Sequence, residues 1–352
     1  MTNLKQASRE LYRRSPDEIF ADLPALQAHC RRERELSRDY WTPPKRLLFA
    51  EEEGQLALDL GDGNELHRLN DWSFGQFCSL AGVSKETVNK VTADTARRVF
   101  DDVLVRQSNG SSKPLQIYAN DERRVVKSTH GVGYSRLHDS DLLDLLMDQA
   151  AEAGFEPPPA GERGGTGLYR GEQDLFVFMI DPAGWTEIGD QAFSPGFFVF
   201  NSEVGKRSIG ISTFWFQGLC KNHIVWDAVE IIEFTRRHTG KVEQALDEIG
   251  RAIADLAAKR DERRDGFAKV IRTAMETKLG ADAEETIQAL VKHGLSRTLA
   301  KQAADMTLNA GQGRYSIFSL VDALTRLANK IPNAGDRCDA DQKAARLLAL
   351  AA

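Results

Sequence analysis

Alternating and uniform apolar positions in the middle of the chain predict a β-sheet. Residues 174–181 are apolar at both alternate sets of positions, which is typical of a central strand covered on both faces. Residues 197–200 have the same character, and residues 207–220 alternate more regularly. Three shorter strands are expected in a segment with Gly, Asn and Asp at its turns, namely residues 103–106, 115–119 and 125–128.

Helical spacing is found on either side of this region. Residues 15–18, Ser-Pro-Asp-Glu, resemble a capping box with proline in the first turn and predict a helix that begins there. Residues 139–153 have the pattern of an amphipathic helix, and the chain after residue 227 carries apolar residues three and four apart to its end. Around Gly61-Asp62-Gly63-Asn64, residues 55–60 and 65–69 predict a β-hairpin.

These elements predict an α+β fold, with an antiparallel-rich central sheet, packed helices and a mostly helical C-terminal part. The organisation expected is an N-terminal helical arm and hairpin over residues 1–63, a mixed α+β core over 64–240, and a helical region over 241–352. With 352 residues the chain can bury a large core without disulfides or a structural metal.

Charge and composition narrow the class of protein. The 46 basic and 52 acidic side chains give a net charge of −6, which excludes a globally basic nucleic-acid coat, so that an anionic partner must meet a local patch. No apolar run is long enough for a membrane span, and residues 1–10 lack the apolar segment of a signal peptide. The four cysteines are far apart, which favours free thiols and a cytoplasmic protein.

Motifs for catalysis or cofactor binding are not found in the sequence. The Gly-Lys steps at 205–206 and 240–241 lack the hydroxyl residue that a phosphate-binding loop requires. Cys220, His223 and His238 do not have the paired spacing of a zinc site, so no metal and no cofactor are expected. The sequence therefore favours a binding protein over an enzyme.

Residues 74–91, FGQFCSLAGVSKETVNKV, resemble a helix-turn-helix. Cys78 is small, Gly82 stands at the turn and Ser84 can cap a second helix. In this interpretation Lys85, Asn89 and Lys90 would read duplex DNA. A helical hairpin with a purely structural role has the same pattern.

The stretch 198–222, FVFNSEVGKRSIGISTFWFQGLCKN, is similar to the signature of a family of uncharacterised phage- and plasmid-borne proteins, domain of unknown function 932. The resemblance implies carriage on a mobile element and implies no established activity. The sequence departs from the family pattern at Gln217 and Gly133, where positive charge is lost. The residues that carry the resemblance are Asn201, Ser202, Glu203, Gly205, Cys220 and Asn222.

Basic residues surround the turns of the predicted sheet. If these turns converge, they would form a basic groove with aromatic platforms, which suits single-stranded nucleic acid. The structural alternative is that the charges are solvated and the aromatic rings are buried. The residues expected to bind are Arg123, Arg124, Lys127, Lys206, Arg207, Phe214, Phe216 and Lys221.

The leading hypothesis is therefore a non-enzymatic protein of a mobile element that binds single-stranded DNA, with strand annealing and homo-oligomer formation as further expectations. One alternative is a sequence-specific duplex binder that uses residues 74–91. Another is an interaction scaffold or an inhibitor of a host protein, for which the acidic surface and the helical tail would serve.

Overall fold

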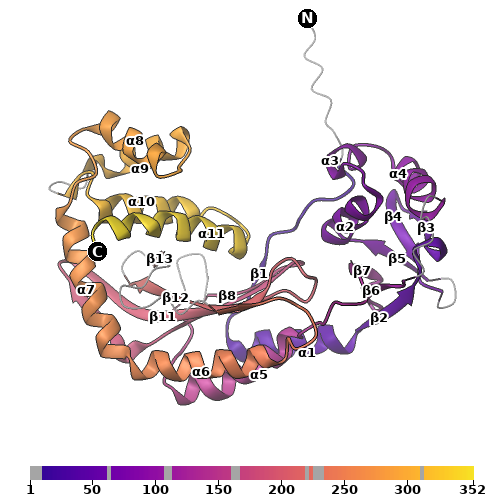
Figure 1. Ribbon diagram of the computed structural model, residues 1–352, viewed down its shortest axis with the longest axis horizontal. Helices are drawn as coiled ribbons and strands as arrows, with labels where there is room; N and C mark the ends of the chain where they lie inside the picture. Colours follow the sequence, from indigo (N-terminus) through magenta and orange to yellow (C-terminus); the bar gives the residue numbers. More distant parts are fainter. Residues whose placement is uncertain are drawn as a thin grey trace, which may run out of the picture.

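The computed structural model describes residues 10–61, 65–106, 113–159, 167–218, 222–224, 234–309 and 313–352, with the backbone alone for 222–224. In this part of the chain the strands form two sheets, and helices pack against both (Figure 1). The α+β class predicted from the sequence is confirmed.

The smaller sheet, sheet B, has the order β2-β6-β7-β5-β4-β3 and is antiparallel except for the β5–β7 pair. The helices α2, α3 and α4 pack on it around Phe74, Phe77 and Phe100, which are buried. Its strands are β2 (Ser37–Thr42), β3 (Leu48–Glu52), β4 (Gln55–Asp59), β5 (Leu66–Leu69), β6 (Leu115–Asn120) and β7 (Val125–His130), and the helices are α2 (Asp71–Ala81), α3 (Lys85–Val88) and α4 (Ala93–Phe100).

The larger sheet, sheet A, has the order β1-β8-β9-β11-β12-β13, with β10 paired to β11 and β14 paired to β12. Every strand pair in it is antiparallel. Its strands are β1 (Glu18–Ile19), β8 (Leu168–Arg170), β9 (Leu175–Ile180), β10 (Thr186–Ile188), β11 (Gln191–Asn201), β12 (Ile209–Gln217), β13 (Asn222–Ile224) and β14 (Phe234–Arg236).

Helices cover both faces of sheet A, as the sequence of β9 predicted. Val177 and Met179 pack with α1 (Leu23–Glu35), α5 (Asp139–Leu145) and α6 (Gln244–Ala258). Phe176 and Phe178 point to the opposite face, where they join a cluster with Cys338 of α11 (Ala334–Ala345). In Figure 1, α5 and α6 lie below the sheet, whereas α10 and α11 lie above it.

The C-terminal helices continue from α6 around the end of sheet A (Figure 1). The ring of Trp215 on β12 stacks on Phe267 of α7, with centroids 3.8 Å apart. This contact places one core between the sheet and the helices α7 (Arg260–Glu276), α8 (Ala283–Lys292), α9 (Arg297–Met306) and α10 (Ile317–Ala328).

Strands β2 and β3 lie in the expected N-terminal helical arm, and β14 lies after residue 227, where the spacing predicts helices, so the helical prediction is wrong in these segments. Two further predictions of local structure are also wrong. Helix α1 begins at Leu23 with Asp22 as its cap, while Asp17 of the expected capping box binds the backbone N–H of Ala334 instead. Residues 103–106 belong to a π-helical turn, Asp101–Arg106, that extends α4. In both segments contacts with distant parts of the chain outweigh the local pattern.

The expected domain boundary at residue 63 lies between β4 and β5, which are adjacent strands of sheet B. Strand β2 in the same sheet pairs with β6, so residues 37–59 and 115–130 share one core. The hairpin predicted from residues 55–69 is present in its two strands, although its turn, residues 62–64, lies outside the described residues.

Candidate nucleic-acid interface

The turn between β11 and β12, Asn201–Arg207, faces sheet B. The Ser202 hydroxyl donates to the Gln173 carbonyl over 2.5 Å and accepts from the Lys206 amide over 2.9 Å. Gly205 has a φ of +74°, and a Cβ there would lie 2.7 Å from Cε1 of His130 on β7. Glycine is therefore required both for the backbone conformation and for the close approach of the two sheets.

Glu203 of this turn is buried among charged groups. Its carboxylate lies 3.6 Å from Nζ of Lys127 and 3.8 Å from Nη2 of Arg170, and it accepts from the Asp139 amide over 2.9 Å. Burial alone would raise the pKa of Glu203, but the hydrogen bond from His138 and the charges of Lys127 and Arg170 bring it well below its usual value. Glu203 is therefore ionised in the folded protein.

The neighbours of Glu203 complete a buried network that joins the two sheets. Burial and the charge of Glu203 raise the pKa of Asp139 to about 6, against the opposing effect of Arg170. Burial also lowers the pKa of Lys127, whose Nζ is 3.5 Å from the Glu33 carboxylate. Strongly shifted carboxyl groups occur at functional sites and in structural ion-pair networks alike. Here each charge has a partner within the protein, which favours the structural role.

The basic residues expected at the predicted groove are mostly paired with carboxylates. Arg123 is 3.3 Å from Glu33, and Arg124 is 3.5 Å from Glu52. Lys127 is buried in the network around Glu203. Arg207 donates to Asp174 over 2.8 Å and lies over the ring of Phe176.

The expected aromatic platforms are not exposed. Phe214 and Phe216 are 0% and 2% exposed because they belong to the core cluster beneath α11. Neither ring can stack on a base in this fold, so the groove does not form at the predicted position. Lys221 and Cys220 lie outside the described residues. Asn222 pairs with Gln217 in the sheet, and only its backbone is among the described parts of the structure.

The helix-turn-helix resemblance yields a helical hairpin without a reading helix. Gly82 ends α2 in the left-handed conformation, and Ser84 caps α3, as the pattern predicts. However, α3 is a single turn, and Asn89 is buried, where it bonds both the amide and the carbonyl of Tyr12. Lys90 is exposed and forms an ion pair with Glu86. The duplex-reading interpretation of Lys85, Asn89 and Lys90 is therefore not supported by the fold.

A groove of about 540 Å³ lies between α2 and the end of β7, and we call it the α2–β7 groove. Lys85 extends along it, with its ammonium 2.7 Å from Asp71. Lys206 approaches from the Asn201–Arg207 turn, with its ammonium 5.4 Å from the ring centroid of Trp72. The lining comprises Trp72, Gly75, Gln76, Ser79, Leu80, Lys85, Leu115, Thr129, His130 and Gly131.

Aromatic rings and one exposed ammonium are the features of this groove that a ligand could use. Trp72 is half-buried, and its indole N–H donates to the Val204 carbonyl over 2.8 Å, which fixes the ring. His130 stacks on Tyr134 at 3.7 Å, and burial lowers its pKa to about 3, so it presents a neutral ring. Lys206 is exposed and has no carboxylate partner in the part of the chain that the structure describes.

Sequence reasoning identified Lys206 and Lys85 under two separate hypotheses, and the structure brings both to this groove. It missed Trp72, Gln76, Thr129 and His130. A capping pattern at Asn70 and Ser73 marks the start of α2 and could have indicated that Trp72 lies in a first turn, near the surface.

Comparisons with family models, curated proteins and solved structures find no match to this chain. The resemblance to domain of unknown function 932 therefore remains a prediction. No helix among the described residues is long and apolar enough to cross a membrane. The described residues also contain no group of three His, Cys, Asp or Glu that could hold a metal ion, and Cys30, Cys78 and Cys338 are buried free thiols.

Proposed function

We propose that the protein binds single-stranded nucleic acid and that the α2–β7 groove holds one nucleotide of the strand. The observation that carries the proposal is the position of the Lys206 ammonium beside the fixed ring of Trp72 at an open groove. A ring and an adjacent cation are complementary to a base and its phosphate. In a duplex the bases are stacked and paired, so an unpaired strand fits this arrangement better.

The pairing of the other cations limits the strength of binding. Arg123, Arg124, Lys127 and Arg207 each face a carboxylate, which leaves, of the candidate cations that the structure describes, Lys206 and, after exchange of its partner Asp71, Lys85. Two phosphate contacts predict a log–log salt slope of about −1.4 on a single strand, because each contact contributes about −0.7. Base stacking on Trp72 would add about 1–3 kcal/mol, independent of sequence.

The proposal is tested by fluorescence anisotropy with labelled single-stranded and duplex DNA at two salt concentrations. We expect the single strand to bind more tightly than the duplex. Lys206→Ala should weaken binding about three- to tenfold and reduce the salt slope by about 0.7, since one phosphate contact is lost. Trp72→Leu should weaken binding at both salt concentrations without changing the slope.

Lys90→Ala is the matched control, because Lys90 is also an exposed lysine but is not among the residues that line the groove. It should bind like the unchanged protein. Absence of binding at low salt, or equal losses from Lys206→Ala and Lys90→Ala, would overturn the proposal. Absence of binding would favour the alternative of a protein-interaction scaffold, which co-purification from the native host would examine. Strand annealing and a homo-oligomer remain predictions.

A further inference from the structure

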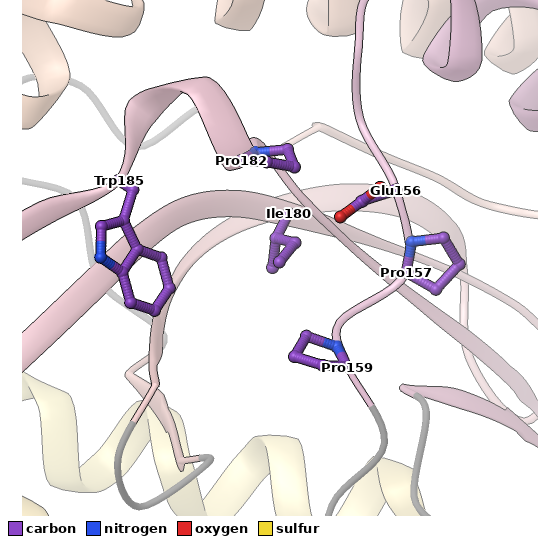
Figure 2. A pocket seen from close by; sticks show the side chains of 6 residues that line it. All are labelled: Glu156, Pro157, Pro159, Ile180, Pro182 and Trp185. Atoms are coloured by element: carbon purple, nitrogen blue, oxygen red, sulfur yellow. The ribbon is translucent and has the colours of Figure 1, made fainter.

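A second cavity, of about 550 Å³, lies at the other end of the sheet A strands. Leu175 at the start of β9 pairs with Asn201 beside the α2–β7 groove, whereas Ile180 at its end lines this cavity. Figure 2 shows Trp185 on one side, Pro157 and Pro159 on the other, and Ile180 with Pro182 between them. We call this cavity the Trp185 pocket; it is lined by Glu156, Pro157, Pro159, Ile180, Pro182 and Trp185.

The walls of the Trp185 pocket are held in place before any ligand arrives. Glu156 and Ile180 exchange two backbone hydrogen bonds, of 2.9 and 2.7 Å. The turn Pro182–Gly184 is capped by the side chain of Asp181, which in turn forms an ion pair with Arg260. Prolines have little conformational freedom to lose, so binding here costs little ordering.

Trp185 is an exposed aromatic ring with a fixed position. It is 44% exposed, although one edge rests on the backbone, where a Cβ on Gly218 would lie within 2.4 Å of the ring. The absence of a side chain at Gly218 therefore leaves room for the ring, and Figure 2 shows Trp185 at one side of the pocket. An exposed indole face attracts cations through its negative electrostatic potential.

Glu156 supplies a negative charge to the same pocket. Figure 2 shows its carboxylate directed toward the space above Ile180. Asp181 nearby is neutralised by Arg260, but no ion pair or side-chain hydrogen bond of Glu156 is formed within the described residues. The pocket thus combines apolar walls, one aromatic ring and one carboxylate that has no partner among the described residues.

We propose that the Trp185 pocket binds a small organic cation with an apolar body, such as a quaternary ammonium compound. The indole and the carboxylate would share the positive charge, and the prolines with Ile180 would contact the alkyl groups. A neutral compound of the same shape would keep the apolar contacts and lose both electrostatic ones. The ligand class is therefore defined by a preference for charge and not by shape alone.

The test compares choline with its neutral isostere 3,3-dimethyl-1-butanol. The protein is labelled with 5-fluorotryptophan, and the resonance of Trp185 is assigned from its loss in Trp185→Phe. We expect a saturable shift of this resonance with choline, at a concentration about fivefold or more below that required for the alcohol. Equal responses to the two compounds, or no saturable shift with choline, would overturn the proposal.

Variants separate the two electrostatic contributions. Glu156→Gln should lower the preference for choline over the alcohol about threefold or more while leaving the affinity for the alcohol unchanged. Trp185→Leu should also show a smaller preference for choline over the alcohol, and choline binding to this variant is followed through the choline methyl signal. Glu152→Gln is the matched control, since Glu152 is an exposed carboxylate outside the pocket. An equal effect of Glu152→Gln and Glu156→Gln would show that only net charge matters and would refute the site.

Discussion

Lys127 of sheet B and Glu203, in the turn between β11 and β12 of sheet A, face each other across the junction of the two sheets, with 3.6 Å between Nζ and the nearest carboxylate oxygen. Both side chains are at most 10% exposed. Removal of one partner from a buried pair leaves the other charge without compensation, which costs more than the pair itself contributes. The ion pair therefore helps to fix the position of one sheet relative to the other.

Glu203→Gln should lower the free energy of unfolding by about 3 kcal/mol, because Lys127 and Arg170 would lose a buried counter-charge. Urea denaturation followed by circular dichroism measures this change. Glu122→Gln is the control, since Glu122 forms an exposed ion pair with Arg32 and should cost less than about 1 kcal/mol. Similar losses in the two variants would mean that the buried network does not stabilise the junction.

Glu172 should make the stability depend on pH. Burial, and then the charge of Asp71, raise its pKa to about 7 from an ordinary value near 4.5. The folded state thus holds this proton more tightly than the unfolded state, so the stability from Glu172 is complete below pH 4.5 and is lost as the pH rises through 7.

Glu172→Gln should remove this dependence. The variant should exceed the unchanged protein in free energy of unfolding by more at pH 8 than at pH 4.5. Urea midpoints at the two pH values measure the difference. The exposed Glu187 provides the control, since Glu187→Gln should give the same difference from the unchanged protein at both pH values. A difference in stability between Glu172→Gln and the unchanged protein that is the same at both pH values would contradict the raised pKa of Glu172.

Gly205→Ala should destabilise the protein by about 1–2 kcal/mol, since its φ of +74° is unfavourable for alanine. The displacement of His130 that the new Cβ requires adds to this cost. Thermal unfolding measures the loss. Gly240→Ala is matched to it, because a Cβ at Gly240 meets no atom within 4 Å, and should leave the melting temperature nearly unchanged. Equal melting temperatures for both variants would argue against the close approach of the sheets at this turn.

Asp17→Ala should loosen α11 from the rest of the protein. The Asp17 carboxylate accepts from the Ala334 amide over 2.7 Å and from Asn333 over 2.9 Å, and loss of such a cap costs about 1–2 kcal/mol. In this variant the hydrogen-exchange rate of the backbone amides should rise more in α11 than in β9. The exposed Asp336 serves as the comparison, since Asp336→Ala should leave α11 protected. Protection of α11 that survives Asp17→Ala would assign no capping role to Asp17.

The central strands of sheet A could be predicted because burial on both faces gives a local apolar pattern in the sequence. Phe176 and Val177 alternate between two apolar faces, and both faces proved to be covered. The tight turn between β11 and β12 also has a local origin, since Asn201, Ser202 and Gly205 are residue types that favour turns wherever they occur. Such features depend on neighbours within a few residues.

Whether a charged residue is buried in an ion pair or exposed could not be predicted from such local patterns. Lys127 and Lys206 look equivalent in the sequence, yet one is buried against Glu203 and the other is exposed beside Trp72. The difference arises from which distant carboxylate the fold brings near each lysine. Aromatic residues present the same difficulty, because Phe214 in a core and Trp72 at a groove both follow apolar patterns.

The cover that α11 places over the aromatic face of sheet A has a consequence during synthesis. Phe176 and Phe198 leave the ribosome well before residues 334–345, which later shield that cluster. Until then the nascent chain exposes a row of phenylalanine rings. Its productive folding in the cell should therefore rely on chaperones that recognise aromatic segments, and translation that stops before α11 should yield aggregates instead of a smaller stable protein.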